Sequence, residues 1–408
     1  MVHIVDSQRA LSYPGWSLRQ GEFAVQNPYF RKHDSQPRQK KQKQEPSRTD
    51  VQTNEHHSTI ASWLSHCIEE AQTAWPSIEK AEENNSKDDP PNIDFISLLK
   101  LTERFMTPIQ GIIEVDQDCM VMDTLDLLNI VITNPANSCR RIQLPDDTRY
   151  LVPPQASFLM GDMHTSMDPL VDFGKQWNEE LDILLIILTS GKTAQSKGGF
   201  DCVVLDPPWP NKSVHRSSHY ETQDIYDLFT IPLPSLLRPG QCSLVAVWVT
   251  NKPKYRRFIQ EKLFKAWGVT WAADWYWVKM TTAGELVMPL DSPHRKPYEQ
   301  IVVGHTCDQD HDIGSQSIFS TPCKRHSRKP PLQDILSPYL RSDPQCLEMF
   351  ARCLIPSWTS WGNECIKFQH EQYFAREEAV VDAETLLTKE VASENEMNGK
   401  ELLGSKCT

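Results

Sequence analysis

The sequence predicts an α/β protein whose sheet carries helices on both faces, and three observations within residues 156–375 support this. The run Phe200–Leu205 is largely apolar and ends at Asp206, as expected for a strand buried on both faces. Ser243–Val249 is a second such run, and Lys254–Trp267 then shows helical spacing. Ligands bind such sheets at the carboxyl ends of strands, so we expect an active site near Asp206.

Composition divides the chain into five regions. Residues 1–58 form a basic, disordered or weakly ordered N-terminal region, because much of this stretch lacks large apolar side chains. Apolar residues at helical spacing predict a helical region over residues 59–112, and short strands with turns predict a middle α/β region over 113–155. Residues 156–375 form the main domain, and residues 376–408 form an acidic disordered tail. Further strands are predicted at Asn129–Thr133, Arg149–Val152, Ile301–Gly304 and Gln345–Met349.

Charge and cysteine usage limit the class of protein. The net charge of −12 is unusual for a nucleic-acid binder, but the stretch from Glu377 onward, with eight acids and three lysines, contributes −5 of it. The basic run at residues 38–43 has two open interpretations: a nuclear localisation signal or phosphate-binding arm, or a solvated charge run. Scattered cysteines indicate a reducing compartment, and the apolar run Leu181–Leu188 is too short to cross a bilayer. We therefore expect a soluble, intracellular protein. The expected location is the nucleus, with the cytosol as a second location.

The tetrad Asp206-Pro207-Pro208-Trp209 carries the predicted chemistry. An exocyclic amine of a nucleobase is a weak nucleophile because its lone pair is delocalised into the ring. The Asp206 carboxylate and the Pro207 carbonyl can accept both of its hydrogens, and the two prolines fix the direction of these acceptors. Trp209 offers a face on which a flipped or single-stranded base can stack. A bare tetrad of this kind is otherwise read as a proline-rich turn, and its position after a strand favours the catalytic reading.

Six segments in a fixed order carry a family resemblance. They are residues 200–211, 247–251, 275–279, 289–299, 326–331 and 347–364. Over residues 114–373 the chain resembles the MT-A70 family of adenine-N6 methyltransferases. The resemblance implies a Rossmann-like class I methyltransferase fold, circularly permuted so that the tetrad precedes the main cofactor loop. It also implies S-adenosyl-L-methionine as cofactor and adenine N6 as the methylated atom, with adenosine of small nuclear RNA, including 2'-O-methyladenosine, as substrate.

The resemblance also implies the residues of the cofactor site. Lys329 would pair with the methionine carboxylate of the cofactor, and Asp206 would contact its amino group. Phe350 and Arg352 would form the cofactor loop after the strand ending near Glu348. The remaining residues implied to contact the cofactor are Asp162, Met163, Asn363 and Glu364.

The residues that follow the tetrad would border the substrate entrance. Phosphate contact is the favoured reading of this group over a solvated loop, because a polyanionic substrate must reach the tetrad. The predicted substrate-binding residues are Asn211, Lys212, Arg216 and Tyr220.

Two departures and two alternatives qualify the match. Cys353-Leu354-Ile355 stands where the family has a basic or polar residue, and residues 174–199 form an insertion before the strand that leads to Asp206.

DNA adenine is the alternative substrate, and a catalytically silent RNA-binding partner is the alternative class. No metal is expected, because the histidines and cysteines between His305 and His326 match no standard zinc spacing, and nothing in the sequence requires a protein partner.

Overall fold

A computed structural model gives the fold, and it describes most of one compact unit, residues 1–375. A second unit begins at Arg376, and nearly all of it lies outside the described residues. The described residues are 1–19, 22–29, 48–76, 112–128, 130–161, 170–172, 198–210, 224–292, 295–307, 312–324 and 328–377.

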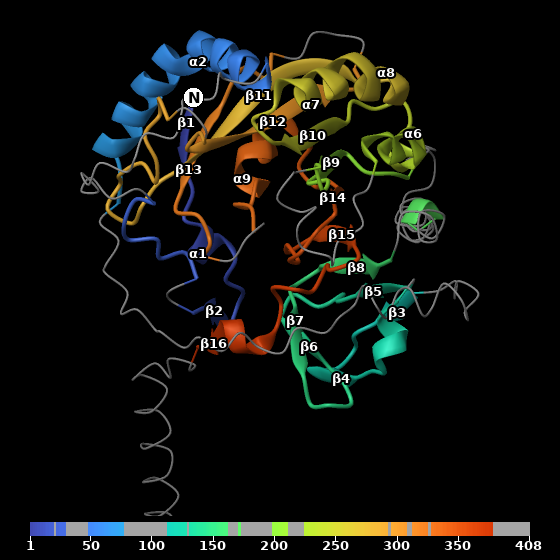
Figure 1. Ribbon diagram of the computed structural model, residues 1–408. Helices are drawn as coiled ribbons and strands as arrows, with labels where there is room; N and C mark the ends of the chain where they lie inside the picture. The colour runs from blue at the N-terminus through green and yellow to red at the C-terminus, as the bar shows by residue number, and fades with distance from the viewer. Residues whose placement is uncertain are drawn as a thin grey trace, which may run out of the picture. The chain divides into compact units, whose positions relative to one another are not determined.

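A mixed sheet of 11 strands runs through the described residues (Figure 1). Its centre is parallel, because β10, β9, β14, β15 and β8 each pair in parallel with the next. The strand β12 is antiparallel to both of its neighbours, β10 and β11. The fold class predicted from the sequence is therefore confirmed. In spatial order the strands are β1 (Val2–Ile4), β13 (Ser317–Ser320), β11 (Thr270–Lys279), β12 (Tyr298–His305), β10 (Leu244–Val249), β9 (Cys202–Leu205), β14 (Cys346–Met349), β15 (Trp358–Gly362), β8 (Ser157–Met160), β5 (Val131–Thr133) and β3 (Ile112–Glu114).

Helices cover both faces of the central strands, since successive residues of a strand point to opposite faces. Val247 of β10 belongs to an apolar core with the helical segment at residues 253–267, which confirms the predicted helix. Its neighbour Trp248 belongs to a core on the other face, which includes Leu336. The helical elements of these two cores are α6 (Leu233–Leu236), α7 (Pro253–Phe258), the π-helical turn η4 (Ile259–Leu263), α8 (Phe264–Trp267) and α9 (Gln333–Leu336).

The prediction of weak order is wrong for residues 1–19 and 22–29. Strand β1 pairs in parallel with β13 at the edge of the main sheet, and β2 (Trp16–Leu18) pairs with β16 (Phe374–Arg376). Apolar side chains that follow the short helix α1 (Ser7–Ala10) form a buried core with the C-terminal part of the described chain. Local composition cannot detect such ordering, because these residues are stabilised by contacts with residues more than 300 positions away. The buried residues concerned are Leu11, Tyr13, Trp16, Leu18 and Phe23.

The helix α2 (Arg48–Thr73) begins before the predicted helical region and packs its apolar side chains against β11 and β12. Residues 77–111 of that region lie outside the described residues. The middle region supplies β3 and β5 to the main sheet and forms a three-stranded sheet of its own. The remaining elements are β4 (Cys119–Val121), β6 (Arg140–Gln143), β7 (Arg149–Val152), η1 (Thr124–Leu127), η3 (Ile225–Thr230), η5 (Ser337–Tyr339) and η6 (Glu371–Tyr373).

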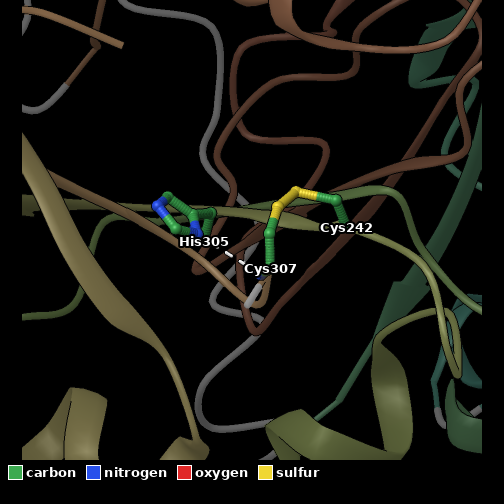
Figure 2. A group of neighbouring side chains, drawn as sticks. All are labelled: Cys242, His305 and Cys307. Atoms are coloured by element: carbon green, nitrogen blue, oxygen red, sulfur yellow. Dashed lines mark hydrogen bonds between the residues drawn. A yellow bond between two sulfur atoms is a disulfide. The ribbon is translucent and has the colours of Figure 1, made fainter. Parts of the chain in front are cut away.

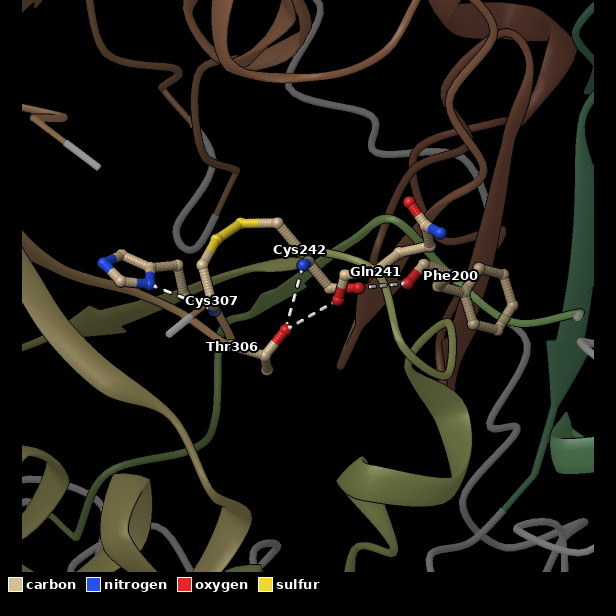
Figure 3. The surroundings of a disulfide bond; sticks show 7 residues. Phe200, Gln241, Cys242, Thr306 and Cys307 are labelled. Carbon is tan, nitrogen blue, oxygen red and sulfur yellow. Dashed lines mark hydrogen bonds between the residues drawn. A yellow bond between two sulfur atoms is a disulfide. The ribbon is translucent and has the colours of Figure 1, made fainter. Parts of the chain in front are cut away.

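Cys242 and Cys307 form a disulfide, although the composition predicts reduced thiols (Figure 3). The two cysteines lie 65 residues apart but face each other where β10 begins and β12 ends. Beside them, Thr306 Oγ1 donates a hydrogen bond to the Gln241 carbonyl and accepts one from the Ser243 backbone amide, two residues further along the chain. Within the described part of the chain, no helix has the length and apolar character needed to cross a membrane.

Candidate active site

Asp206 follows β9 at the carboxyl edge of the parallel strands, as the sequence predicts. Its backbone amide donates a hydrogen bond of 3.2 Å to the Met349 carbonyl, so it lies beside the end of the neighbouring strand β14. The next residue, Pro207, is buried, whereas Pro208 is exposed. The fixed backbone angle of proline restricts this turn, and the Asp206 carboxyl group is held below the surface with 12% of its side chain exposed.

The Asp206 carboxylate belongs to a chain of alternating charges. Lys329 Nζ lies 3.4 Å from Asp206 Oδ1 and 2.6 Å from Glu299 Oε2, and Lys279 Nζ lies 2.5 Å from Glu299 Oε1. Burial alone would raise the pKa of Glu299, but the two lysines outweigh it and lower that pKa to about 2. Burial raises the pKa of Asp206, and Lys329 and Arg352 oppose this rise. The pKa of Lys329 is raised because its two carboxylates outweigh the effect of burial.

The sequence-based prediction missed Glu299 and Lys279 as site residues, although both lie in the segments that carry the family resemblance. Lys329 was assigned to the methionine carboxylate of a cofactor, and in the structure its ammonium contacts two carboxylates of the protein itself. The sequence contains only a weak indication that these two residues belong to the site. Glu299 and Lys279 stand in otherwise largely apolar strands, where a charged residue that is not exposed usually has a partner.

A second set of charges follows β14. Phe350 has a positive φ of 62°, a conformation that a bulky residue adopts only when its surroundings impose it. Gly362 permits this turn, because a Cβ there would lie 3.1 Å from the Ala351 backbone nitrogen. The turn directs Arg352 to Glu364, with Arg352 Nε 3.3 Å from Glu364 Oε2, and to Asp206, with Arg352 Nη1 3.7 Å from Asp206 Oδ2.

Glu348 lies in the same cavity but has a different electrostatic state. Burial raises its pKa to about 8, and the nearby Asp206 charge adds to the effect. Its Oε2 atom is buried and has no hydrogen-bond partner among the described residues. A pKa raised this far favours the protonated, neutral form of Glu348 at neutral pH.

Trp209 is fixed by a hydrogen bond and by a ring contact. Its Nε1 donates a hydrogen bond of 2.7 Å to the Trp248 carbonyl, and its ring lies 4.9 Å from that of Tyr255. The Tyr255 hydroxyl donates to the Pro210 carbonyl at 2.8 Å, and Lys252 Nζ donates to the same oxygen at 3.3 Å. The tetrad is thus connected to the first turn of α7, which carries positive charge.

Five of the predicted residues line one cavity together with Trp248 and the segment at residues 328–332. They are Asp206, Lys329, Glu348, Phe350 and Arg352. Glu364 forms an ion pair with Arg352, which lines this cavity, whereas Asn363 is exposed. The structure thus brings together residues that are far apart in the sequence. The predicted residues Asp162, Met163, Asn211, Lys212, Arg216 and Tyr220 lie outside the described residues.

A group of possible metal ligands lies at the other end of β10. Donor atoms of Cys242, His305 and Cys307 lie within 4.8 Å of one another (Figure 2). The two sulfur atoms are bonded to each other and cannot both act as thiolate ligands in this state. His305 Nδ1 accepts a hydrogen bond from the Cys307 backbone amide. The absence of a metal requirement stays a prediction.

The strand that leads to the tetrad, β9, precedes β14 in the sequence, and this order and the mixed α/β sheet fit a class I methyltransferase fold. Residues 200–364 match the MT-A70 family, so this segment of the chain belongs to that family. The chain is 40% identical over 262 residues to the N(6)-adenine-specific methyltransferase METTL4 of Mus musculus, which covers 61% of this chain and 50% of that protein. It is 36% identical over 203 residues to the N6-methyladenosine RNA methyltransferase MTA1 of Pyricularia oryzae, covering 45% of this chain and 52% of that protein. It is 30% identical over 240 residues to a DNA N6-methyl methyltransferase of Caenorhabditis elegans, covering 58% of each chain. The chain thus spans about half the length of the curated relatives it matches.

Proposed function

We propose that this protein transfers a methyl group from S-adenosyl-L-methionine to N6 of adenine in nucleic acid. The observation that carries the proposal is the position of Asp206. It ends a parallel strand within a cavity shared with Lys329, Glu348 and Arg352, and Trp209 is fixed beside it. The names of the relatives support the same reaction.

Asp206 and the turn that follows it would orient the substrate amine. A buried carboxylate and a rigid proline carbonyl can accept the two N6 hydrogens and favour a nitrogen with an available lone pair. Lys329 and Arg352 oppose the rise in the Asp206 pKa and so favour the ionised, accepting form. Trp209, held by Trp248 and Tyr255, would support the adenine ring by stacking.

The described residues of the cavity fit the proposed cofactor. When bound, S-adenosyl-L-methionine supplies an electrophilic methyl group on a sulfonium. Asp206 offers a carboxylate to its amino group, and Glu348 offers a buried carboxyl oxygen without a hydrogen-bond partner among the described residues. Arg352, Glu364 and Phe350 would hold its ribose and adenine, together with Asn363 and the pair Asp162 and Met163. The chain's own residues thus position the reactants, and positioning is the main requirement of an in-line displacement.

RNA is the proposed substrate, with adenosine or 2'-O-methyladenosine of small nuclear RNA as the target. The relative from Pyricularia oryzae is named as an RNA enzyme, and Lys252 and Lys254 place positive charge beside Tyr255 at the tetrad. DNA adenine is the second candidate, because the Caenorhabditis elegans relative is named as a DNA enzyme. For such an RNA we further propose a nuclear location, also supported by the basic run at residues 38–43. Fluorescence microscopy of the tagged chain tests it, and exclusion from the nucleus would refute it.

The test of the substrate is a matched set of oligonucleotides. Purified protein is incubated with labelled cofactor and one sequence made as RNA, as RNA with 2'-O-methyladenosine at the target, and as DNA, followed by nucleoside mass spectrometry. We expect N6-methylated adenosine in the RNA products and a lower yield in DNA. Equal or greater yield in DNA would select the second candidate. Absence of product on every substrate would leave the catalytically silent RNA-binding partner.

A further inference from the structure

Arg328 is a buried cation that the proposed reaction does not use. Only 2% of the residue is exposed, and none of its three guanidinium nitrogens has a hydrogen-bond partner among the described residues. The guanidinium carbon lies 5.4 Å from the Phe23 ring centroid and 5.1 Å from that of Phe368. The side chain is therefore held by two aromatic rings while its donors remain unused.

Such an arrangement is costly as long as the guanidinium donors have no hydrogen-bond partner. A buried charge is stable only when it is paired and hydrogen-bonded, and contacts with ring faces attract the cation without satisfying its N–H groups. A guanidinium presents its donors as a planar fork that matches the two oxygens of a carboxylate. The unused donors of Arg328 thus indicate a small anion as the missing partner.

The position of Arg328 identifies where that anion would bind. Arg328 lines the same cavity as Asp206, Lys329 and Glu348. In this cavity Lys329 already contacts the carboxylates of Asp206 and Glu299. Arg352 likewise contacts two carboxylates of the protein. Of the three described cations that line the cavity, Arg328 is therefore the one without a carboxylate partner among the described residues.

We propose that Arg328 binds the methionine carboxylate of S-adenosyl-L-methionine, a role that rests on the proposed function. The carboxylate is the anionic group of this cofactor. Phosphates of a nucleic acid are excluded as the partner, because a guanidinium only 2% exposed cannot reach a polyanion at the surface. Lys329 then stays bound to Asp206 and Glu299, and its role is to orient the Asp206 carboxylate.

The proposal also gives the N-terminal segment a part in the cofactor pocket. Leu11 lines the cavity, and Phe23 contacts Arg328. The segment that composition describes as weakly ordered therefore supplies one wall of the pocket and fixes the orientation of its carboxylate-binding residue.

Two ligands that differ in the amino-acid group test the proposal. S-adenosylhomocysteine carries the carboxylate, and 5'-methylthioadenosine lacks the whole amino-acid group. Isothermal titration measures both affinities for the wild-type protein, Arg328→Gln and Lys329→Gln. We expect Arg328→Gln to weaken S-adenosylhomocysteine binding roughly tenfold or more, and to change methylthioadenosine binding by less than about twofold. Lys329→Gln should weaken the two ligands by similar factors.

The opposite pattern overturns the proposal: a selective loss of S-adenosylhomocysteine in Lys329→Gln with no such loss in Arg328→Gln. Equal weakening of both ligands in Arg328→Gln would assign Arg328 a purely structural role and also overturns it. If Arg328→Gln does not fold, Arg328→Lys keeps the charge, and a crystal structure of the wild-type complex decides. A carboxylate oxygen within hydrogen-bond distance of the guanidinium supports the proposal, and a carboxylate bound elsewhere refutes it. No turnover is needed, so a protein that binds S-adenosylhomocysteine but methylates nothing would refute the proposed function alone.

Discussion

Glu348→Gln should change how the stability of the unliganded protein depends on pH. Burial raises the Glu348 pKa from 4.5 to about 8, so the folded protein keeps this group protonated while the unfolded chain ionises it. The contribution of this group to the free energy of unfolding is therefore fully present below pH 4.5, and it is lost as the pH rises toward 8. At about 1.4 kcal/mol for each pH unit, the whole loss is about 5 kcal/mol, of which about 2 kcal/mol has occurred at pH 6. Gln resembles the protonated acid and does not titrate.

Urea denaturation at pH 6 and pH 8.5 measures this difference. Relative to wild type, the Gln variant should gain about 3 kcal/mol more unfolding free energy at pH 8.5 than at pH 6. Glu114, which is exposed and lies on an edge strand, supplies the control, since Glu114→Gln should shift stability little at either pH. An equal effect of Glu348→Gln at both pH values would refute the reasoning, because it would mean that the carboxyl group ionises normally in the folded protein.

Three further predictions concern the frame around the site. Asp201→Ala should destabilise the protein by about 3–5 kcal/mol in urea denaturation, because it leaves Arg238, 2.7 Å away and buried, without its carboxylate; a loss below about 1 kcal/mol would contradict this. Tyr255→Leu removes both the ring beside Trp209 and the hydroxyl that is hydrogen-bonded to the Pro210 carbonyl, so it should raise KM for the oligonucleotide several-fold in steady-state assays. Tyr255→Phe keeps the ring and should have a smaller effect. Equal effects of the two variants would contradict the role of the ring. Gly362→Ala should lower the melting temperature and weaken S-adenosylhomocysteine binding, because its Cβ would press on the Ala351 backbone; unchanged melting and affinity would show that the turn at Phe350 can relax.

The sequence predicts the central sheet well because its strands are continuous apolar runs. Strands β9, β10 and β14 and the helical segment at residues 253–267 appear where the pattern places them. The position of Asp206 follows from the same pattern, since a polar residue directly after a buried strand lies at the sheet edge. These features depend on local sequence, and local sequence is sufficient to predict them.

Features that depend on distant contacts were not predicted. Strand β1 has three residues, and it is ordered by its pairing with β13 more than 300 positions later. The contact of Glu299 with Lys329 joins residues 30 positions apart, and the Cys242–Cys307 bond joins residues 65 positions apart. The periodicity of apolar residues along the chain does not predict such pairs, because each partner is compatible with many environments until the fold brings the two together.

The central claim is that the Asp206 carboxylate orients the amine that is methylated. The most direct test is the single-turnover rate of N6 methylation in Asp206→Asn and wild-type protein, measured with saturating S-adenosyl-L-methionine and the best oligonucleotide. Asn keeps the shape of the side chain but loses one acceptor and the charge, so the rate should fall roughly a hundredfold or more while the circular dichroism spectrum stays unchanged. A variant that folds normally and methylates adenine at the wild-type rate would contradict the account.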